Sequence, residues 1–171
     1  MRRKVILALV ALVFAASTAL GGTIKIGAIY PLTGPAATTG KELADAIKLA
    51  QDIINNKYDF NLPLAKSEGL PNLGGAKIEV VIADHQGKPD VGLSEAERLI
   101  TEEKVVALLG CYYSSVTKTA SLAAERHKIP FLNPESTAAS LTERGFKWFF
   151  RTTPNDDTFS ENFFQFLNDL N

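Results

Sequence analysis

The stretch AKIEVVIADHQGKPDVGLSEAERLITEEKVVALLGCYYSS, residues 76–115, decides the fold because two apolar segments flank a helical pattern. Residues 76–84 and 105–110 are rich in valine, isoleucine and leucine, as buried strands are. Between them, residues 91–103 carry apolar side chains at helical spacing, and Asp90, directly after Pro89, is expected to cap this helix. Two strands joined through a helix predict a parallel pair.

The same alternation of strand and helix continues on both sides of this stretch. Only residues 57–75 break the rhythm, and we interpret them as a surface excursion. Five strand–helix units with apolar strands predict an α/β fold, a doubly wound parallel sheet of about five strands covered on both faces, with right-handed crossovers. The further expected elements are strands at 23–30, 129–133 and 147–152 and helices at 41–56, 115–127 and 156–170.

Composition excludes several classes of function. The 171 residues carry 18 basic and 19 acidic side chains, a net charge of −1, and no basic stripe, so a nucleic-acid partner is not expected. One cysteine and two scattered histidines give no metal-ligand spacing, and the glycine patterns of phosphate and dinucleotide sites are absent, so we expect no metal and no cofactor. Cys111 has no partner in the chain and is expected to be buried as a small apolar residue.

The N-terminus differs in character from the rest of the chain. A basic start, MRRK, is followed by the apolar run VILALVALVFAA and the small-residue stretch STALGG. The apolar run is shorter than the ~20 residues that a spanning helix needs. We therefore predict a signal peptide at residues 1–21, cleaved near Ala19–Gly22, no membrane insertion after cleavage, and one exported domain at 22–171.

Ligands of doubly wound sheets bind at the carboxyl ends of the strands, near the point where the strand order reverses. The corresponding loops are 31–40, 84–89, 110–115 and 133–138, and all are rich in Gly, Ser, Thr or Pro. The loop GCYYSS at 110–115 leads into a helix, where free backbone N–H groups and serine hydroxyls can hold an anion without a lysine or arginine.

The candidate ligand residues in these loops are hydroxyl-bearing side chains. Ser114 and Ser115 lie at the expected helix start, although Ser115 can also be read as an ordinary N-cap. Ser136 and Thr137 add hydroxyls from the neighbouring loop. Tyr113, with Tyr112, is read either as a pocket wall or as a packing residue.

Nucleophilic catalysis by Ser114 or Ser115 is the competing interpretation. A serine hydrolase needs a histidine base, and the G-x-S-x-G elbow is missing. His127 falls at the far end of its helix, and His85 falls at the correct end of a strand but has no evident orienting partner. We therefore expect a binding protein and not an enzyme.

Taken together, the segments from IKIGAIYPLTG through VVALLGCYYSS to IPFLNPESTAAS and WFFRTTP resemble the leucine/isoleucine/valine-binding protein family. The likeness runs from residue 23 to the end of the chain. It implies a type I periplasmic-binding fold with two hinged lobes, of which residues 22–171 would form the N-terminal one. It also implies capture of an amino acid or related small carboxylate in the periplasm and delivery to the membrane permease of an ABC importer. An amide- or urea-type sensor of the same fold is the alternative.

The resemblance also assigns roles to particular residues. Ser114 matches the serine that receives the ligand's carboxylate, Glu135 the position whose backbone carbonyl accepts from the ammonium, and Thr137 the threonine that contacts both. Ser136 lies between the last two. Thr39 stands where amino-acid binders often have an aromatic residue against the ligand side chain.

Overall fold

The computed structural model describes residues 21–170, so the predicted signal peptide lies outside it apart from Gly21. Its centre is one sheet of five strands in the order β2-β1-β3-β4-β5, in which β1 and β3, β3 and β4, and β4 and β5 pair in parallel. The predicted α/β fold with a five-stranded parallel sheet is confirmed. The strands are β1 (Thr23–Tyr30), β2 (Lys77–Asp84), β3 (Ala107–Gly110), β4 (Phe131–Asn133) and β5 (Phe149–Arg151).

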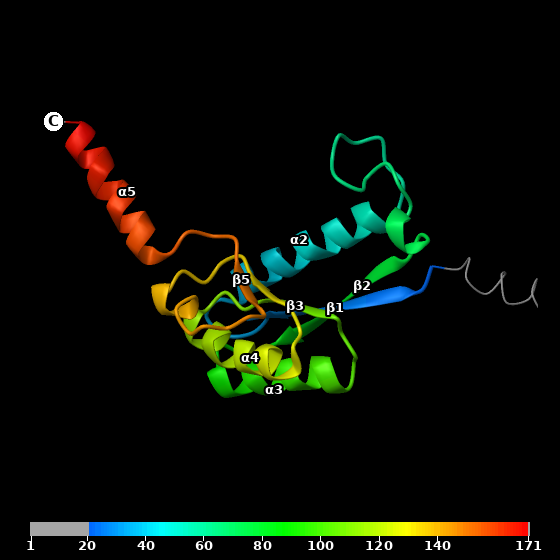
Figure 1. Ribbon diagram of the computed structural model, residues 1–171, viewed down its shortest axis with the longest axis horizontal. Coiled ribbons are helices and arrows are strands. Elements are labelled where there is room, and N and C mark those ends of the chain that lie inside the picture. The colour runs from blue at the N-terminus through cyan, green and yellow to red at the C-terminus, as the bar shows by residue number, and fades with distance from the viewer. Residues whose placement is uncertain (1–20, 171) are drawn as a thin grey trace, which may run out of the picture. The chain divides into compact units, whose positions relative to one another are not determined.

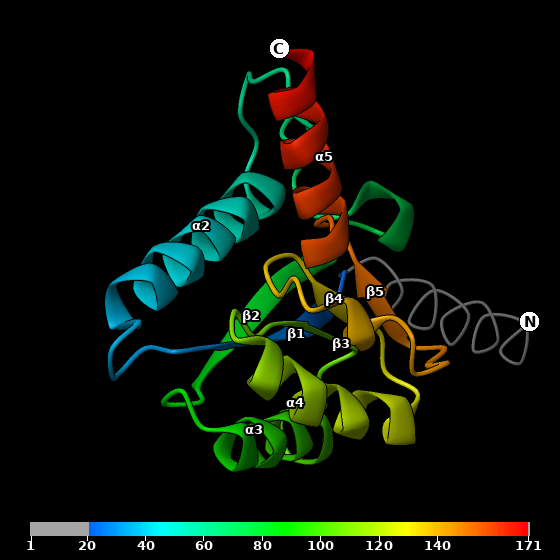
Figure 2. The same ribbon diagram turned by 90° about the vertical axis from the view of Figure 1, so that its left-hand side faces the viewer.

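Helices lie on both sides of this sheet (Figure 1). Helices α3 and α4 lie next to each other on one face, and the first part of α2, up to Lys48, lies on the other (Figure 2). Strand order reverses between β1 and β3, so the loops that leave these two strands flank the expected ligand position. The helices are α2 (Ala37–Asn55), α3 (Pro89–Thr101), α4 (Ser114–His127) and α5 (Asp156–Asp169), with short 3-10 turns η1 (Pro71–Leu73) and η2 (Ala139–Leu141).

Helix α2 begins four residues before its predicted start at residue 41, so Thr39 lies in its first turn and not in a loop. Close packing explains the difference. A Cβ at Gly40 would lie 2.1 Å from the backbone oxygen of Pro31, so only glycine lets this turn approach the end of β1. The glycine that favoured a loop in the sequence instead permits a tertiary contact.

The predicted N-cap of α3 is wrong, and so is the alternative interpretation of Ser115 as the N-cap of α4. Lys88 is the N-cap of α3 and Pro89 its first residue, which suits proline because its ring fixes φ and the first helical N–H needs no partner. Asp90 therefore lies in the first turn. Tyr113 is the N-cap of α4 and makes no side-chain capping bond, so Ser115 is not a cap either.

The main core lies between the sheet and helices α3 and α4. Leu108, Phe131 and Phe149 stand in register on neighbouring strands, and all three are buried on this face. A Cβ at Gly92 of α3 would lie 2.3 Å from Val116 of α4, so glycine sets the close approach of the two helices. Cys111 belongs to this core and is fully buried, as expected.

The opposite face is less well covered than predicted. The row Leu109, Leu132 and Phe150 stands in register there, and the Phe150 side chain is 51% exposed. Helix α5 begins at an Asn155 cap, with Asp156 and Asp157 in its first turn, and none of its residues is buried among the described ones. The prediction that both faces are fully covered is therefore wrong at β5.

The described residues divide into two compact units. One contains residues 21–24 and Leu49–Glu79, and the other contains Lys25–Lys48 and residues 80–170. In the first, the Asn55 amide bonds the backbone of Ile78 in both directions, while residues 57–75 form mostly exposed turns, as expected. All predicted ligand residues lie in the second. No helix within residues 21–170 is long and apolar enough to cross a membrane.

Candidate functional site

Buried polar side chains gather at the carboxyl ends of the strands. Five polar or charged side chains in the described residues are buried, and four of them serve the loops that follow β2, β3 and β4. We call these four the polar cluster: His85, Thr117, Asn133 and Ser136. Since buried polar groups require hydrogen-bond partners, the bonds of this cluster determine the shape of the loops.

Asn133, the last residue of β4, folds the loop that follows it. Its Oδ1 accepts from the backbone N–H groups of Glu135 (3.2 Å) and Ser136 (2.8 Å). Its Nδ2 donates to the Ser136 carbonyl oxygen at 2.8 Å. One fully buried amide therefore replaces the backbone partners that these groups lack outside the sheet.

Two buried hydroxyls join this loop to the one after β3. Thr117 Oγ1 accepts from the Cys111 N–H at 3.1 Å and lies 2.7 Å from Ser136 Oγ. Ser136 Oγ donates to the Tyr112 carbonyl oxygen at 3.0 Å. Because the Ser136 hydroxyl hydrogen is used in the bond to Tyr112, the Thr117 hydroxyl is the donor in its bond to Ser136.

His85 connects the loops after β2 and β3. Its Nε2 lies 2.8 Å from the Cys111 carbonyl oxygen, and its Nδ1 accepts from the Gly87 N–H at 2.9 Å. One nitrogen must donate and the other accept, so the ring is neutral. Burial lowers the pKa of His85, and the bond to Cys111 opposes this only in part.

This burial predicts an acid-dependent loss of stability. The folded pKa of His85 lies below its unfolded value of about 6.5, so its contribution is present above that pH and is lost as pH falls through the folded pKa. In urea unfolding from about pH 8 to pH 5, His85→Gln should remove part of the pH dependence seen in the parent chain. His127→Gln is the control, because His127 lies on the surface beside Glu97 (2.7 Å). Identical profiles for the parent and His85→Gln would contradict the assignment.

The loop after β1 is fixed by Asp84 at the end of β2. Its carboxylate accepts from the Leu32 N–H (2.9 Å), the Thr33 hydroxyl (2.6 Å) and the Gln86 N–H (2.8 Å). Partial burial alone would raise the pKa of Asp84, but these hydrogen bonds outweigh it and lower the pKa below its usual value. A charged Asp84 thus holds the loops after β1 and β2 together.

Glu135 extends from the loop after β4 to the end of β1. The buried Tyr30 hydroxyl donates to Glu135 Oε1 at 2.7 Å. Burial raises the pKa of Glu135, while the Tyr30 bond and backbone groups lower it by less. Burial together with the nearby Glu135 carboxyl also raises the pKa of Tyr30, so the phenol keeps its proton.

Several hydrogen-bond donors remain unused where α4 begins. Ser114 is half-buried, and its Oγ accepts from the Ala138 N–H at 3.3 Å, which leaves its hydroxyl hydrogen available. The backbone N–H groups of Ser114 and Ser115 and the Thr137 hydroxyl have no acceptor within residues 21–170. Ser114 and Thr137 come from adjoining loops, because β3 and β4 are neighbours and Ala138 bonds Ser114.

The other predicted ligand residues lie in different surroundings. Ser136 is 1% exposed, and its hydroxyl is committed to the polar cluster, so it supports the loop from beneath. The Tyr113 ring packs edge-on to His85 and Tyr112, with ring centres 5.9 and 5.2 Å away. Thr39 is half-buried in α2, and no hydrogen bond in the described part of the chain joins it to the other predicted residues.

Sequence reasoning missed the residues that hold the loops: Tyr30, Asp84, Thr117 and Asn133. Asn133 carried a usable signal, since an asparagine that ends a strand before Pro-x-Ser is typical of a side-chain-stabilised turn. Tyr30 carried none, because its partner lies 105 residues away. Thr117 resembles any other helical threonine in the sequence.

Neither His85 nor His127 is placed to act as a base for these serines. Both ring nitrogens of His85 are engaged with backbone groups, and His127 pairs with Glu97 at the far end of α4. Within residues 21–170, no group of His, Cys, Asp or Glu side chains could hold a metal ion. The arrangement is suited to binding an anionic group with neutral donors.

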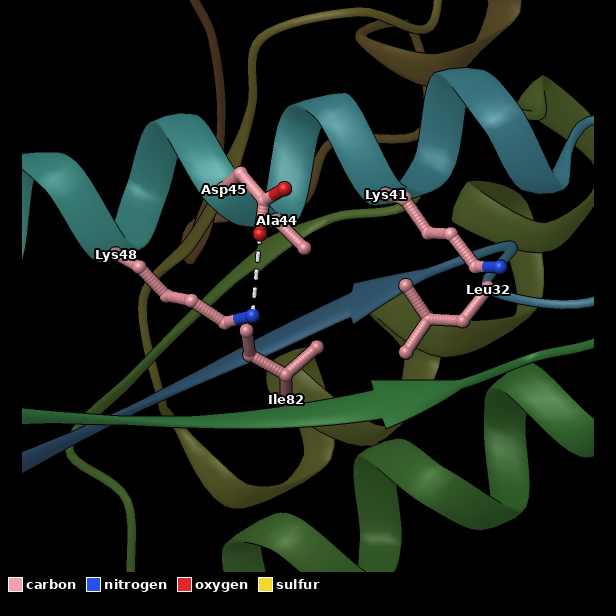
Figure 3. A pocket seen from close by; sticks show the side chains of 6 residues that line it. All are labelled: Leu32, Lys41, Ala44, Asp45, Lys48 and Ile82. Atoms are coloured by element: carbon pink, nitrogen blue, oxygen red, sulfur yellow. Dashed lines mark hydrogen bonds and ion pairs between the residues drawn. The ribbon is translucent and has the colours of Figure 1, made fainter.

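A separate pocket of about 380 Å³ lies between α2 and the strands (Figure 3). Leu32, Ala44 and Ile82 form its apolar part, and Lys41 and Lys48 extend along its rim. Asp45 pairs with Lys48 at 3.1 Å. The pocket shares no residue with the predicted ligand set.

Known proteins resemble this chain over most of its length. A family model described as "Periplasmic binding protein" matches residues 23–169. "Leu/Ile/Val-binding protein homolog 8" of Brucella suis is 31% identical over 154 residues, which are 89% of this chain and 34% of the relative. The chain therefore spans about a third of the length of this relative.

Solved structures give the same result. The branched-chain amino acid transporter substrate-binding protein LivJ of Streptococcus pneumoniae, in complex with isoleucine, has a TM-score of 0.65 and 29% identity, and covers 78% of this chain and 34% of its own. A solute-binding protein of an ABC transporter from Rhodopseudomonas palustris, in complex with 3,4-dihydroxybenzoic acid, has a TM-score of 0.61 and 28% identity. The similar part covers 78% of this chain and 32% of that protein. With the match of the family model over nearly all described residues, the chain belongs to the periplasmic binding protein family.

Proposed function

We propose that this chain is the ligand-capturing lobe of an exported, periplasmic solute-binding protein for an amino acid or related small carboxylate. The observation that carries the proposal is the group of unused donors where α4 begins, on loops fixed by buried hydrogen bonds. Both named ligands of the similar structures, isoleucine and 3,4-dihydroxybenzoic acid, are carboxylic acids.

The donors suit a carboxylate in number and position. Two backbone N–H groups at a helix N-terminus favour negative charge, because their dipoles point out of the helix. The Ser114 and Thr137 hydroxyls can bond the same group, and the Glu135 carbonyl is the acceptor expected for an ammonium. No lysine or arginine takes part, so the ligand is released without breaking a strong ion pair.

The wider role follows from the relatives. Delivery to the membrane permease of an ABC importer is part of the proposal, as is a second lobe that closes over the ligand. Thr39 and Tyr113 are proposed to line the side-chain part of the pocket. Hydrolysis by Ser114 is disfavoured because His85 has no free ring nitrogen.

Removal of one hydroxyl tests the site. One lobe leaves much of a small ligand in water, so we expect millimolar binding of isoleucine or 3,4-dihydroxybenzoate, measured by NMR titration. Ser114→Ala should weaken it about ten- to a hundredfold, since a hydrogen bond to a charged group contributes ~1.5–3 kcal/mol. Thr137→Ala should have a similar effect, and the two losses should not add, because both residues hold one ligand.

Ser140→Ala is the matched control, because Ser140 is an exposed serine in η2. Its titration should superimpose on that of the parent chain. Unchanged affinity in Ser114→Ala, together with ester hydrolysis that this variant loses, would replace the binding role by a catalytic one.

A further inference from the structure

Among the side chains of residues 21–170, Glu135 has the one buried nitrogen or oxygen atom that lacks a hydrogen-bond partner. This atom is Oε2; the other carboxyl oxygen accepts from Tyr30. None of the ion pairs in the described part of the chain includes Glu135. The Glu135 carboxyl group therefore has neutral hydrogen-bond donors, the Tyr30 hydroxyl among them, and no ion-pair partner within residues 21–170.

The groups that face Glu135 are also uncharged. Tyr30 approaches from β1 and Cys111 from the end of β3, and burial raises the pKa of both side chains, so phenol and thiol keep their protons. His85 lies behind Cys111 as a neutral ring bonded to its carbonyl oxygen. The remaining contribution comes from the backbone of Tyr112 and of Glu135 itself.

These surroundings favour the neutral acid. Glu135 is partly buried, and a carboxylate withdrawn from water without a cation costs more than the neutral acid, because the charge loses part of its hydration. Burial raises the pKa of Glu135 by this mechanism. The same loop presents the Thr137 hydroxyl, next to the end of α4 that would receive the ligand's carboxylate.

We propose that Glu135 is an un-ionised acid in the ligand-free lobe, and that its neutrality is what allows a carboxylate to bind in the neighbouring loops. The inference rests on the proposed function, since it concerns the same site. When Glu135 ionises, a negative charge develops beneath the loop and repels the ligand's carboxylate. Glu135 is then a specificity-determining residue that makes the affinity of the site for a carboxylate depend on pH.

The sign of the pH effect follows from the direction of the shift. The folded pKa lies above the ordinary value near 4.5, so Glu135 is neutral below the folded pKa, and carboxylate affinity is lost as pH rises through it. Affinity for 3,4-dihydroxybenzoate, which carries a carboxylate and no ammonium, should fall about tenfold as pH rises through the folded pKa.

The test combines two measurements on the 171-residue chain. A carbon-13 NMR titration of glutamate carboxyls should show one resonance that ionises above the usual range and disappears in Glu135→Gln. Titrations with 3,4-dihydroxybenzoate across the same pH range should then give a pH-dependent affinity in the parent chain and a flat profile in Glu135→Gln. Glu143→Gln, which alters an exposed glutamate near η2, should leave both parent profiles intact.

The outcomes separate the two proposals. A Glu135 carboxyl that ionises at its ordinary pKa, or parallel affinity profiles in the parent and Glu135→Gln, would overturn the inference alone. Failure of isoleucine and 3,4-dihydroxybenzoate to bind at any pH would overturn the proposed function, while the carboxyl titration still decides the state of Glu135. Loss of the pH dependence only in Glu135→Gln supports both.

Discussion

Replacing Asn133 by alanine is expected to lower the free energy of unfolding by about 3–5 kcal/mol, because two backbone N–H groups and one carbonyl lose their partner at a buried position. The cavity left by the side chain adds to the loss. Urea unfolding followed by circular dichroism measures the effect, with the slope checked to confirm that the transition itself is unchanged.

Asn155 provides the matched control for this change. Its Oδ1 also accepts from a backbone N–H, that of Thr158 at 2.8 Å, but the bond caps an exposed helix end. Asn155→Ala should therefore cost only about 1 kcal/mol. Equal losses in the two variants would show that burial of the Asn133 turn contributes little.

Replacing Gly110 by alanine is expected to cost about 4 kcal/mol or more, and the chain is expected to be largely unfolded. Gly110 ends β3 with a φ of +127°, a conformation that side chains disfavour by ~1–3 kcal/mol. An added Cβ would lie 2.3 Å from the backbone oxygen of Ile29, which stands opposite it in the sheet. That oxygen cannot move without separating β1 from β3, so the clash adds to the strain.

Gly145→Ala separates strain from collision. Gly145 has a φ of +69°, and a Cβ there would meet nothing within 4 Å. It should cost about 1 kcal/mol through conformation alone. If both glycine variants lose the same stability in urea unfolding, the contact with Ile29 is not the cause.

The sequence alone determined the class of fold and the edge of the sheet where the candidate site lies. Apolar runs of strand length alternate with helical periodicity from residue 23 onward, and both patterns are local, so they can be read without knowing contacts. Connection rules then lead to a parallel sheet and to its carboxyl edge. For this reason the loops that contain Ser114 and Thr137 can be identified from the sequence alone.

Only the tertiary structure decided what lies beneath those loops. It moved the start of α2 to Ala37, because Gly40 packs on Pro31, and it committed the Ser136 hydroxyl to Thr117 and Tyr112. It also brought Tyr30 to Glu135 across 105 residues of sequence. Local periodicity cannot specify such pairs, because whether a polar side chain faces a ligand or a buried partner depends on residues that become neighbours only when the sheet forms.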